Sequence, residues 1–349
     1  SCLVGSEMCI RDSAYRVSDI WRRPLQLPEM LVSPIGTIGD KLRLLKLRQR
    51  ALRGDLSALY RRPETTAPEL LRQLGFSPRI IERFFKPFFA GVFFEPKLQV
   101  SSRAFEFVFR AFALGDTALP AGGREEIPRQ LAARLAADTI QCNRRVAGVV
   151  DGAAILEDGG QVKARAIVIA TEGGETDRLL GNTPGPTRGT TCLYFAAPEP
   201  PFEGPYLALD ATGQGPINSL LCPSNLSAAY APPDEALITV NVFGSEHDPD
   251  TLEARVRAQL HRWYGDSVDS WRRLAVYRLP AALPVQAPPV QAPSAARQVR
   301  DGLWVAGERA APPSIHWALA SGRLTAEALL GGLSPNQRND NQHRDQTQA

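Results

Sequence analysis

The segment that decides the fold class is residues 302–330, GLWVAGERAAPPSIHWALASGRLTAEALL. A short apolar strand at 303–306 is followed by the glycine–acid pair Gly307 and Glu308, a proline-containing loop, and a helix from about Ser314. A glycine lets another molecule approach the backbone, and a carboxylate accepts hydrogen bonds from hydroxyl groups. The N-terminus of a helix offers free N–H groups to an electron-rich ring or a phosphate. The segment therefore predicts a strand–turn–helix unit that can hold a cofactor.

The same segment resembles the C-terminal FAD motif of the superfamily of amine oxidases, protoporphyrinogen oxidases and phytoene desaturases. In that motif a strand ends in Ala-Gly-Asp or Ala-Gly-Glu, and the helix opens with small residues. The matching positions here are Ala306, Gly307, Glu308, Pro313, Ser314, Ile315, Ala318, Ser321 and Gly322. The resemblance implies that Glu308 binds the ribityl chain of FAD, that the backbone at 313–315 approaches the isoalloxazine ring, and that Ala318 lies in the cofactor-binding helix.

Two other stretches resemble parts of the same superfamily. RVAGVV, at 145–150, resembles a strand whose first valine, here Val146, contacts adenine through its backbone. AIVIATEGGE, at 166–175, resembles the strand after which Ala170 and Thr171 pass the dinucleotide. The stretch 83–135 is similar to desaturase-like members, so the resemblance extends over nearly all of 14–333.

The glycine fingerprint that usually cradles the FAD diphosphate, GxGxxG, does not follow a strand and open a helix anywhere in the chain. The nearest match, at 213–218, has Asn218 in place of the third glycine and continues as a strand, so we expect a β-turn there. Residues 1–13, SCLVGSEMCIRDS, resemble a translated sequencing adapter and are excluded from the fold. We therefore expect the natural sequence to begin near Ala14 in mid-protein, without its first βαβ unit, and the fragment to bind FAD weakly or not at all.

The predicted fold class is α/β, with two domains built from discontinuous pieces. An incomplete FAD/NAD(P)-binding Rossmann-like domain would consist of residues 116–188 and 294–333. An α+β substrate domain, built on an antiparallel sheet, would consist of the helical part 14–115 and the sheet and helix of 189–293. Residues 334–349, rich in Asn, Gln, Arg and Asp, are expected to be a disordered tail.

Periodicity and turn residues predict the individual elements. Helices are expected at 40–53, 67–74, 101–114, 124–137, 175–180 and 249–265. Strands are expected at 139–142, 145–150, 153–157, 161–163, 166–170, 190–197, 206–210 and 236–243, with a hairpin turn at 157–160 and a buried parallel strand at 166–170. A proline-rich connector is expected at 280–293. The phenylalanine-rich stretch 80–96 is either core or the lining of an apolar substrate cavity.

Composition and charge exclude several functions. The 349 residues are 44% hydrophobic and 22% charged with a net charge of +3, which gives no electrostatic case for nucleic-acid binding. The five cysteines form no CxxC pair, and the four histidines show no metal-ligand spacing. No apolar run reaches the roughly 18 residues of a membrane-spanning helix. The basic helix at 40–53 either packs on its domain with solvated charges or makes a peripheral contact with an anionic membrane.

These features together predict a flavoprotein that transfers hydride from a small hydrophobic organic substrate to flavin N5. A flavoprotein isomerase of the same superfamily and a non-catalytic relative without a dinucleotide site are the alternatives. No residue is assigned as a catalytic base, and His316 either reaches the flavin or caps the helix. We expect a cytoplasmic protein, with membrane association as an alternative and a plastid location if the source is a photosynthetic eukaryote; the oligomeric state stays open.

Overall fold

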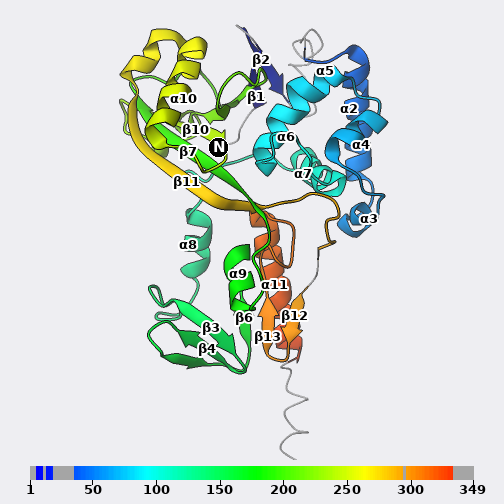
Figure 1. Ribbon diagram of the computed structural model, residues 1–349, viewed down its shortest axis with the longest axis vertical. Helices are drawn as coiled ribbons and strands as arrows, with labels where there is room; N and C mark the ends of the chain where they lie inside the picture. Colours follow the sequence, from blue (N-terminus) through cyan, green and yellow to red (C-terminus); the bar gives the residue numbers. More distant parts are fainter. Residues whose placement is uncertain (1–4, 11–12, 19–34, 294–295, 333–349) are drawn as a thin grey trace, which may run out of the picture. The chain divides into compact units, whose positions relative to one another are not determined.

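The computed structural model describes residues 5–10, 13–18, 35–293 and 296–332 of the 349-residue chain (Figure 1). The chain forms two compact units, each built from separate segments of the sequence. Unit 1 comprises Ser1–Thr139 and Thr187–Val290, and unit 2 comprises Ile140–Pro186 and Gln291–Ala349. The assignment of an FAD-binding and a substrate-binding role to the two parts stays a prediction. The expected disordered tail at 334–349 lies outside the described residues.

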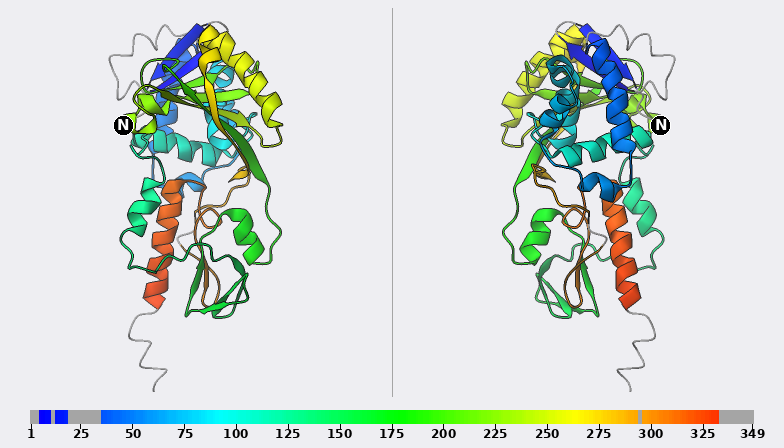
Figure 2. Two further views of the ribbon diagram at one scale, coloured as in Figure 1. Left: turned by 90° about the vertical axis from the view of Figure 1, so that its left-hand side faces the viewer. Right: turned by 90° about the vertical axis from the view of Figure 1, so that its right-hand side faces the viewer.

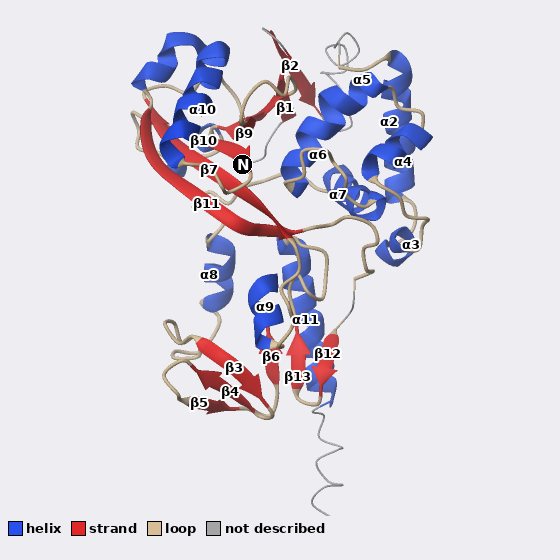
Figure 3. Cartoon of the chain, viewed as in Figure 1, coloured by secondary structure: helices blue, strands red, loops and turns tan. Residues whose placement is uncertain are grey.

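Unit 1 contains a seven-stranded sheet in the order β11-β7-β10-β9-β8-β1-β2 (Figure 3). Neighbouring strands are antiparallel except β1 and β8, which are parallel. The strands are β1 (Gly5–Ile10), β2 (Ser13–Ser18), β7 (Thr187–Ala197), β8 (Tyr206–Asp210), β9 (Ile217–Leu221), β10 (Ala236–Phe243) and β11 (Arg272–Pro284). The predicted strands at 190–197, 206–210 and 236–243 are thereby confirmed as parts of an antiparallel sheet.

One face of this sheet packs on the helix α10 (Pro249–Tyr264), which confirms the helix predicted there. Residues alternate along β10, so that Ile238, Val240 and Val242 point into one core with Val256 and other apolar residues of α10. The side chain of Asp248 caps the first turn of α10 by accepting the Thr251 N–H at 2.9 Å. The side-chain alternation of β10 and the cap of α10 are both local sequence features, and they determine which side chains form this face of the sheet.

Two expectations about unit 1 are corrected. The connector predicted at 280–293 is a strand as far as Pro284, because β11 lies at the edge of the sheet, where a proline without an N–H costs no ladder hydrogen bond. Residues 1–13 were excluded from the fold, yet β1 pairs with β8 through its backbone. Backbone pairing does not require an alternating side-chain pattern, and the origin of these residues stays a prediction.

The helical part of unit 1, drawn in blue to cyan, lies beside the sheet, which α6 contacts at β8 and β9 (Figure 2). The helices are α2 (Ile38–Leu52), α3 (Leu56–Tyr60), α4 (Ala67–Gln73), α5 (Pro78–Ile80), the π-helix η2 (Ile81–Phe85), α6 (Lys86–Phe93), α7 (Ser102–Leu114) and α8 (Glu126–Ala132). The helices predicted at 40–53, 67–74 and 101–114 are confirmed with small shifts of their ends. The helix predicted at 124–137 is shorter, because its residues after Ala132 form turns.

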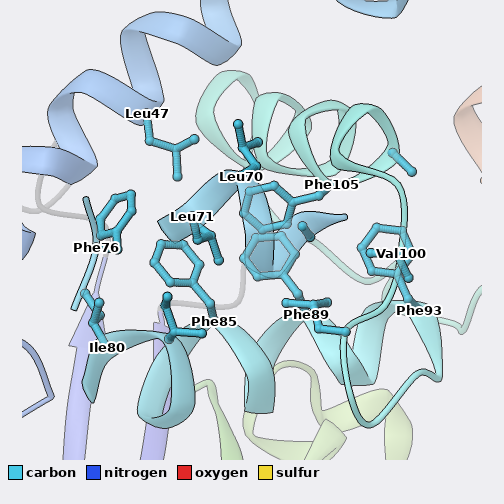
Figure 4. Packing of buried hydrophobic residues seen from close by; sticks show 14 of the residues in the cluster. Leu47, Leu70, Leu71, Phe76, Ile80, Phe85, Phe89, Phe93, Val100 and Phe105 are labelled. Atoms are coloured by element: carbon cyan, nitrogen blue, oxygen red, sulfur yellow. The ribbon is translucent and has the colours of Figure 1, made fainter. Parts of the chain in front are cut away.

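Phenylalanine rings form the core of these helices (Figure 4). Phe85, Phe89 and Phe105 are fully buried, and the ring centroids of Phe89 and Phe105 lie 4.7 Å apart. The core interpretation of the stretch 80–96 is confirmed for these inward rings, while Phe84 and Phe88 are only partly buried.

Two buried carboxylates connect the helices of unit 1. Glu106 of α7 accepts hydrogen bonds from Arg50 at 2.6 Å and from Arg62 at 2.9 Å. Asp40, at the start of α2, accepts hydrogen bonds from Thr37 and from both N–H and hydroxyl of Ser77. Burial alone would raise the pKa of Asp40, but the hydrogen bonds from Ser77 and Thr37 outweigh it and lower this pKa to about 2.

Unit 2 contains two three-stranded sheets, in the orders β12-β13-β6 and β3-β4-β5. The strands are β3 (Val146–Val150), β4 (Ala153–Leu156), β5 (Gln161–Lys163), β6 (Ile167–Ile169), β12 (Arg297–Arg300) and β13 (Leu303–Val305), and the helices are α9 (Gly173–Leu179) and α11 (Ile315–Gly332). The parallel pairing of β6 with β13 and the hairpin between β4 and β5 confirm two predictions. The helix at 175–180 is confirmed as α9, which begins two residues earlier.

Two predictions about unit 2 are wrong. Residues 139–142 form turns, because the positive φ angles of Asp138 (66°) and Asn143 (59°) break the extended backbone on both sides. The strand β6 is not fully buried: the side chain of Val168 is 40% exposed, since β6 pairs with β13 alone among the described strands. None of the described helices is long and apolar enough to cross a membrane.

Candidate functional site

The ends of the two parallel strands of unit 2 bring four predicted site residues together. Ile169 pairs with Val305, and the Ala306 N–H donates to the Ile169 carbonyl at 2.9 Å. Ala170 and Thr171 therefore leave β6 next to the point where Gly307 and Glu308 leave β13. Ligands bind at the carboxyl ends of parallel strands in open α/β sheets, so this edge is the candidate site.

Gly307 has the backbone conformation that a close approach requires. Its φ of +89° lies in the region that side chains disfavour, and a Cβ there would have only the Thr171 carbonyl oxygen, 3.8 Å away, as a neighbour. Its N–H donates to Ser321 Oγ at 2.8 Å, and the same hydroxyl donates to the Ala318 carbonyl at 3.1 Å. Ser321 is buried, so this contact fixes α11 to the end of β13.

Glu308 is partly buried and caps the helix α9. Its Oε1 accepts the Gly173 N–H at 2.5 Å. A Cβ at position 173 would come within 2.1 Å of this oxygen, so a larger residue there would displace the Glu308 carboxylate from the Gly173 N–H. Among the described residues Oε2 of Glu308 makes no hydrogen bond, which leaves one carboxylate oxygen for a hydroxyl donor.

Arg309, the residue after Glu308, connects the loop after β13 to a second part of α9. Its guanidinium forms an ion pair with Asp177, and its Nε donates to the Gly173 carbonyl at 3.3 Å. Asp177 is buried and also accepts the Gly185 N–H at 3.2 Å. Sequence reasoning missed this clamp because Asp177 and Arg309 are 132 residues apart.

The predicted adenine contact, Val146, is joined to α9 as well. Arg178 donates to the carbonyl oxygens of Val146 at 2.8 Å and of Ala147 at 2.7 Å. The side-chain hydrogen bond from Arg178 lowers the pKa of Glu175, with which it pairs at 2.5 Å. The short helix α9 thus contacts both β3 and the loop after β13, and it connects these predicted segments to each other.

The helix α11 begins where the motif predicts. Ser314 caps it, because its Oγ accepts the Trp317 N–H at 3.1 Å and its carbonyl accepts the Ala318 N–H at 2.9 Å. The cap is therefore Ser314 rather than His316, which is exposed with its ring beside Trp317. Pro313 is half-buried, while Ile315 (48%) and Ala318 expose their side chains.

This donor set suits one part of an FAD molecule. A carboxylate oxygen fits ribityl hydroxyls, the left-handed glycine leaves space beside the strand, and the first turn of an 18-residue helix offers N–H groups beside exposed apolar side chains. No glycine-rich phosphate cradle exists among the described residues. The described residues therefore suit the ribityl chain and the ring of FAD.

The glycine-rich segment 213–218 is a turn that leads into β9, as predicted. A side chain at Gly215 would overlap Gln259, whose Oε1 accepts the Ile217 N–H at 2.9 Å and whose Nε2 donates to Asp210 at 3.1 Å. Gly215 therefore makes room for a buried glutamine and not for a phosphate.

Two other features of the described residues contain none of the predicted positions, although Leu156, which lines the first, pairs with Val146. A hollow of about 840 Å³ is formed by residues just before β3 and by the end of β4 with the turn that follows it. Its lining residues are Gln141, Asn143, Arg144, Arg145, Leu156, Glu157 and Asp158. His261, Asp266 and Asp269 bring their ligand atoms within 4.8 Å of one another, a grouping that their sequence spacing did not predict. The His261 Nε2 lies 3.0 Å from Asp269, so a surface hydrogen bond accounts for it.

Solved structures with the same fold include several enzymes. Cyclohexylamine oxidase from Brevibacterium oxydans IH-35A is 15% identical, with a TM-score of 0.68 over 95% of this chain and 82% of its own. A proposed protoporphyrinogen oxidase from Exiguobacterium sp. 255-15 is 16% identical, with a TM-score of 0.64 over 94% and 80%. Reduced UDP-galactopyranose mutase is 15% identical, with a TM-score of 0.53 over 82% and 68%. No curated protein sequence matches the chain.

The sequence itself matches a family model. The model of flavin-containing amine oxidoreductases covers residues 11–330, which include the predicted site positions of unit 2, the described helices of unit 1 and the strands of its sheet except β1. The predicted fold class, α/β with an incomplete Rossmann-like domain and an α+β domain built on an antiparallel sheet, is confirmed by the mixed helix and sheet of the structure and by the fold of these solved enzymes. The chain belongs to the flavin-containing amine oxidoreductase family.

Proposed function

We propose that the protein is an FAD-dependent oxidoreductase that takes a hydride from a small hydrophobic organic substrate. When bound, the flavin supplies N5 as the hydride acceptor. The observation that carries the proposal is the edge of unit 2 where Gly307 and Glu308 follow β13 beside the end of β6. Membership of the flavin-containing family supports it independently.

Each predicted site residue has a task in this proposal. Glu308 Oε2 would accept hydrogen bonds from the ribityl hydroxyls while Oε1 stays on the Gly173 N–H. The backbone of Pro313, Ser314 and Ile315 would approach the ring, and the small side chain of Ala318 would leave space for it. The backbones of Ala170, Thr171 and Val146 would contact the rest of the dinucleotide.

The side chains of this chain contribute orientation and exclusion of water. The exposed Ile315 and Leu319 of α11 would cover the ring and keep its surroundings apolar. The hydroxyl of Ser321 holds the Gly307 N–H and so fixes the strand end against α11. No side chain is assigned as a base, because hydride removal by a flavin need not require one.

Flavin binding tests the proposal directly. The chain is titrated into FAD and the quenching of flavin fluorescence is followed, together with a protein extended by the gene sequence upstream of the Ala14 codon. We expect weak binding by the chain and tight binding by the extended protein, if that sequence adds a strand and a GxGxxG fingerprint. In the extended protein, Glu308→Ala should weaken FAD binding by roughly tenfold or more, since it removes a charge-assisted hydrogen bond.

A matched control separates a local from a general effect. Glu327→Ala removes an exposed carboxylate of the helix α11, which among the described residues pairs with Arg323, and should leave FAD binding unchanged. Equal loss in both variants, or no flavin bound by either protein form, contradicts the proposal.

A flavoprotein isomerase is the second candidate, and the likeness to UDP-galactopyranose mutase in fold favours keeping it. An isomerase uses reduced flavin without net oxidation of its substrate. Consumption of an electron acceptor during turnover separates the two, because only the oxidoreductase needs one. A non-catalytic relative would bind no flavin in either protein form.

A further inference from the structure

The seven-stranded sheet of unit 1 has a second face, opposite the one that packs on α10. Side chains alternate along a strand, so Leu193 of β7 faces α10 while Cys192 and Tyr194 point to the other side. Because β11, β7 and β10 lie side by side (Figure 3), Tyr277 and Asn241 flank Cys192 on this second face. The rings of Tyr194 and Tyr277 meet edge to face, with their centroids 5.6 Å apart. This part of the sheet therefore carries an aromatic and polar surface.

Several hydrogen-bond donors of this surface have no protein acceptor. Among the described residues, neither the Tyr194 nor the Tyr277 hydroxyl donates to another group. Asn241 Oδ1 accepts from the Thr190 hydroxyl at 2.5 Å, but the Asn241 amide N–H groups donate to no described residue. Burial raises the pKa of Tyr194, so its hydroxyl keeps its proton and remains a donor at neutral pH. The surface thus offers donors that suit an acceptor group of a ligand.

Arg124 adds a positive charge to the same surface. Burial raises the pKa of Cys192 and of Tyr194, and the nearby guanidinium of Arg124 opposes the rise in both. The two glutamates that follow Arg124 in the sequence both pair with Arg129 instead, at 3.0 and 2.8 Å. Among the described residues no carboxylate pairs with Arg124.

Other charged side chains on this side of the sheet are neutralised. Arg188 of β7 and Arg272 of β11 point to the same side as Tyr194, and they form ion pairs with Glu95 and Glu235. The positive charge of Arg124 is therefore left for a partner that is not part of the described chain.

We propose that this surface, called here the tyrosine face and consisting of Cys192, Tyr194, Asn241 and Tyr277 with Arg124, binds an apolar organic molecule that carries a carboxylate. The carboxylate accepts hydrogen bonds from the guanidinium and the phenol hydroxyls, and the apolar body lies against the two rings. An amine would bring a second positive charge to Arg124, and a neutral molecule would leave the guanidinium without a counter-ion.

The tyrosine face narrows the substrate class to hydrophobic carboxylic acids. Regarding the bound acid as the substrate rests on the proposed function. The binding itself concerns unit 1 alone and does not require flavin, so the two proposals can fail separately.

Three matched probes and the flavin-free chain test this inference. The probes are 4-phenylbutyrate, 4-phenylbutanol and 4-phenylbutylamine, which share one apolar body and differ in the end group. Ligand-detected NMR titration at neutral pH measures the dissociation constant of each. We expect the acid to bind roughly tenfold tighter than the alcohol, because its carboxylate forms a charge-assisted pair, and the amine to bind more weakly than the alcohol.

Single substitutions separate the charge from the rings. Arg124→Gln should weaken binding of 4-phenylbutyrate by roughly tenfold and leave binding of the alcohol unchanged. Tyr194→Phe keeps the ring and removes the hydroxyl, so it should weaken binding of the acid by roughly threefold. Tyr277→Ala removes a ring that is 58% exposed and should weaken binding of all three probes.

A matched control lies on the helix that covers the opposite face of the sheet. Arg255→Gln changes an exposed arginine of α10 and should alter none of the dissociation constants. Circular dichroism establishes that each variant is folded, which is expected because Arg124, Tyr277 and Arg255 are exposed.

Four results would overturn the inference. The unchanged chain does not bind 4-phenylbutyrate, it binds the alcohol or the amine as tightly as the acid, Arg124→Gln binds the acid equally well, or Arg255→Gln loses as much affinity as Arg124→Gln. Failure of the proposed function gives a different pattern, because the extended protein then binds no FAD while the flavin-free chain still prefers the acid.

Discussion

The helical part of unit 1 and the candidate site of unit 2 are stabilised in different ways. In unit 1 the rings of Phe85, Phe89 and Phe105 are fully buried against one another. In unit 2 a small buried cluster among the described residues consists of Ile169, Leu303 and Val305. Its strand ends and helices are joined by polar contacts, such as Arg309 with Asp177 and Gly307 with Ser321. Burial of apolar area should therefore decide the stability of unit 1, and single polar groups should decide the order of the site in unit 2.

The largest effect is expected where an aromatic ring is removed from unit 1. Phe89→Ala should lower the free energy of unfolding by about 3–5 kcal/mol, because it removes the buried ring and leaves a cavity. Hydrogen exchange of peptides from α6 and α7, with urea unfolding, measures the loss. Leu114→Ala, at an exposed position, should change stability by no more than about 0.5 kcal/mol. Similar losses in the two variants would contradict a core made by these rings.

The next effect concerns the clamp of unit 2. Arg309→Ala should destabilise the unit by about 2–3 kcal/mol, since it leaves the buried carboxylate of Asp177 with fewer partners. Hydrogen exchange should rise in α9 and not in α6. The double variant Arg309→Ala/Asp177→Leu should recover part of the loss, because the buried charge is gone. Exchange that is unchanged in α9 would show that the clamp does not order the site.

Unit 1 also contains a buried polar contact, at Asp40, whose contribution can be compared with that of its aromatic core. Because the folded-state pKa of Asp40 is about 2 and its ordinary value is 3.8, its carboxylate stabilises the fold above pH 3.8, and this contribution is lost as the pH falls towards 2. The contribution is about 2 kcal/mol. Stability of the unchanged chain and of Asp40→Asn, measured against pH, should differ at neutral pH and converge at low pH. A constant difference would contradict the role of the charge.

The smallest effect is expected at Gly322 in α11. A Cβ there would meet no atom within 4 Å, so Gly322→Ala should stabilise the flavin-free protein by about 0.5–1 kcal/mol through helix propensity. Gly173→Ala is the contrasting variant, because its Cβ would overlap Glu308. Thermal unfolding without flavin should therefore shift in opposite directions in the two variants. A loss of stability in Gly322→Ala would show that another group occupies the space beside it.

Local patterns predicted much of the fold. The alternation in ALITVNVF predicted β10, and the apolar period that ends at Gly265 predicted α10. The strand and helix around Gly307 and Glu308 were also placed correctly, because a short strand, a glycine and a capping serine are local signals. The prolines at the end of β11 led to the prediction of a connector there. The sequence does not show that a strand lies at the edge of a sheet, where proline is tolerated.

The sequence named residues that the structure brings together, but it did not predict the contacts that connect them. Ala170, Thr171, Gly307 and Glu308 were named from the resemblance, and the parallel pairing of β6 and β13 brings them together. The short helix α9, which joins Glu308, Arg309 and Val146, was not recognised as important. Its acidic first turn, with Glu172 as the capping residue, was the signal available in the sequence.

The sequence by itself determined the family, the strand–turn–helix motif and the basic helix α2, because these depend on residues that are close together in the chain. Only the tertiary structure decided that Gly173 lies against the Glu308 carboxylate, that Glu308 uses one oxygen on α9, and that Leu42 faces solvent while Leu47 is buried. The physical reason is separation along the chain. The hydrogen bond between Gly173 and Glu308 joins residues 135 positions apart, and no local pattern specifies which distant partner satisfies a carboxylate or covers a helix face.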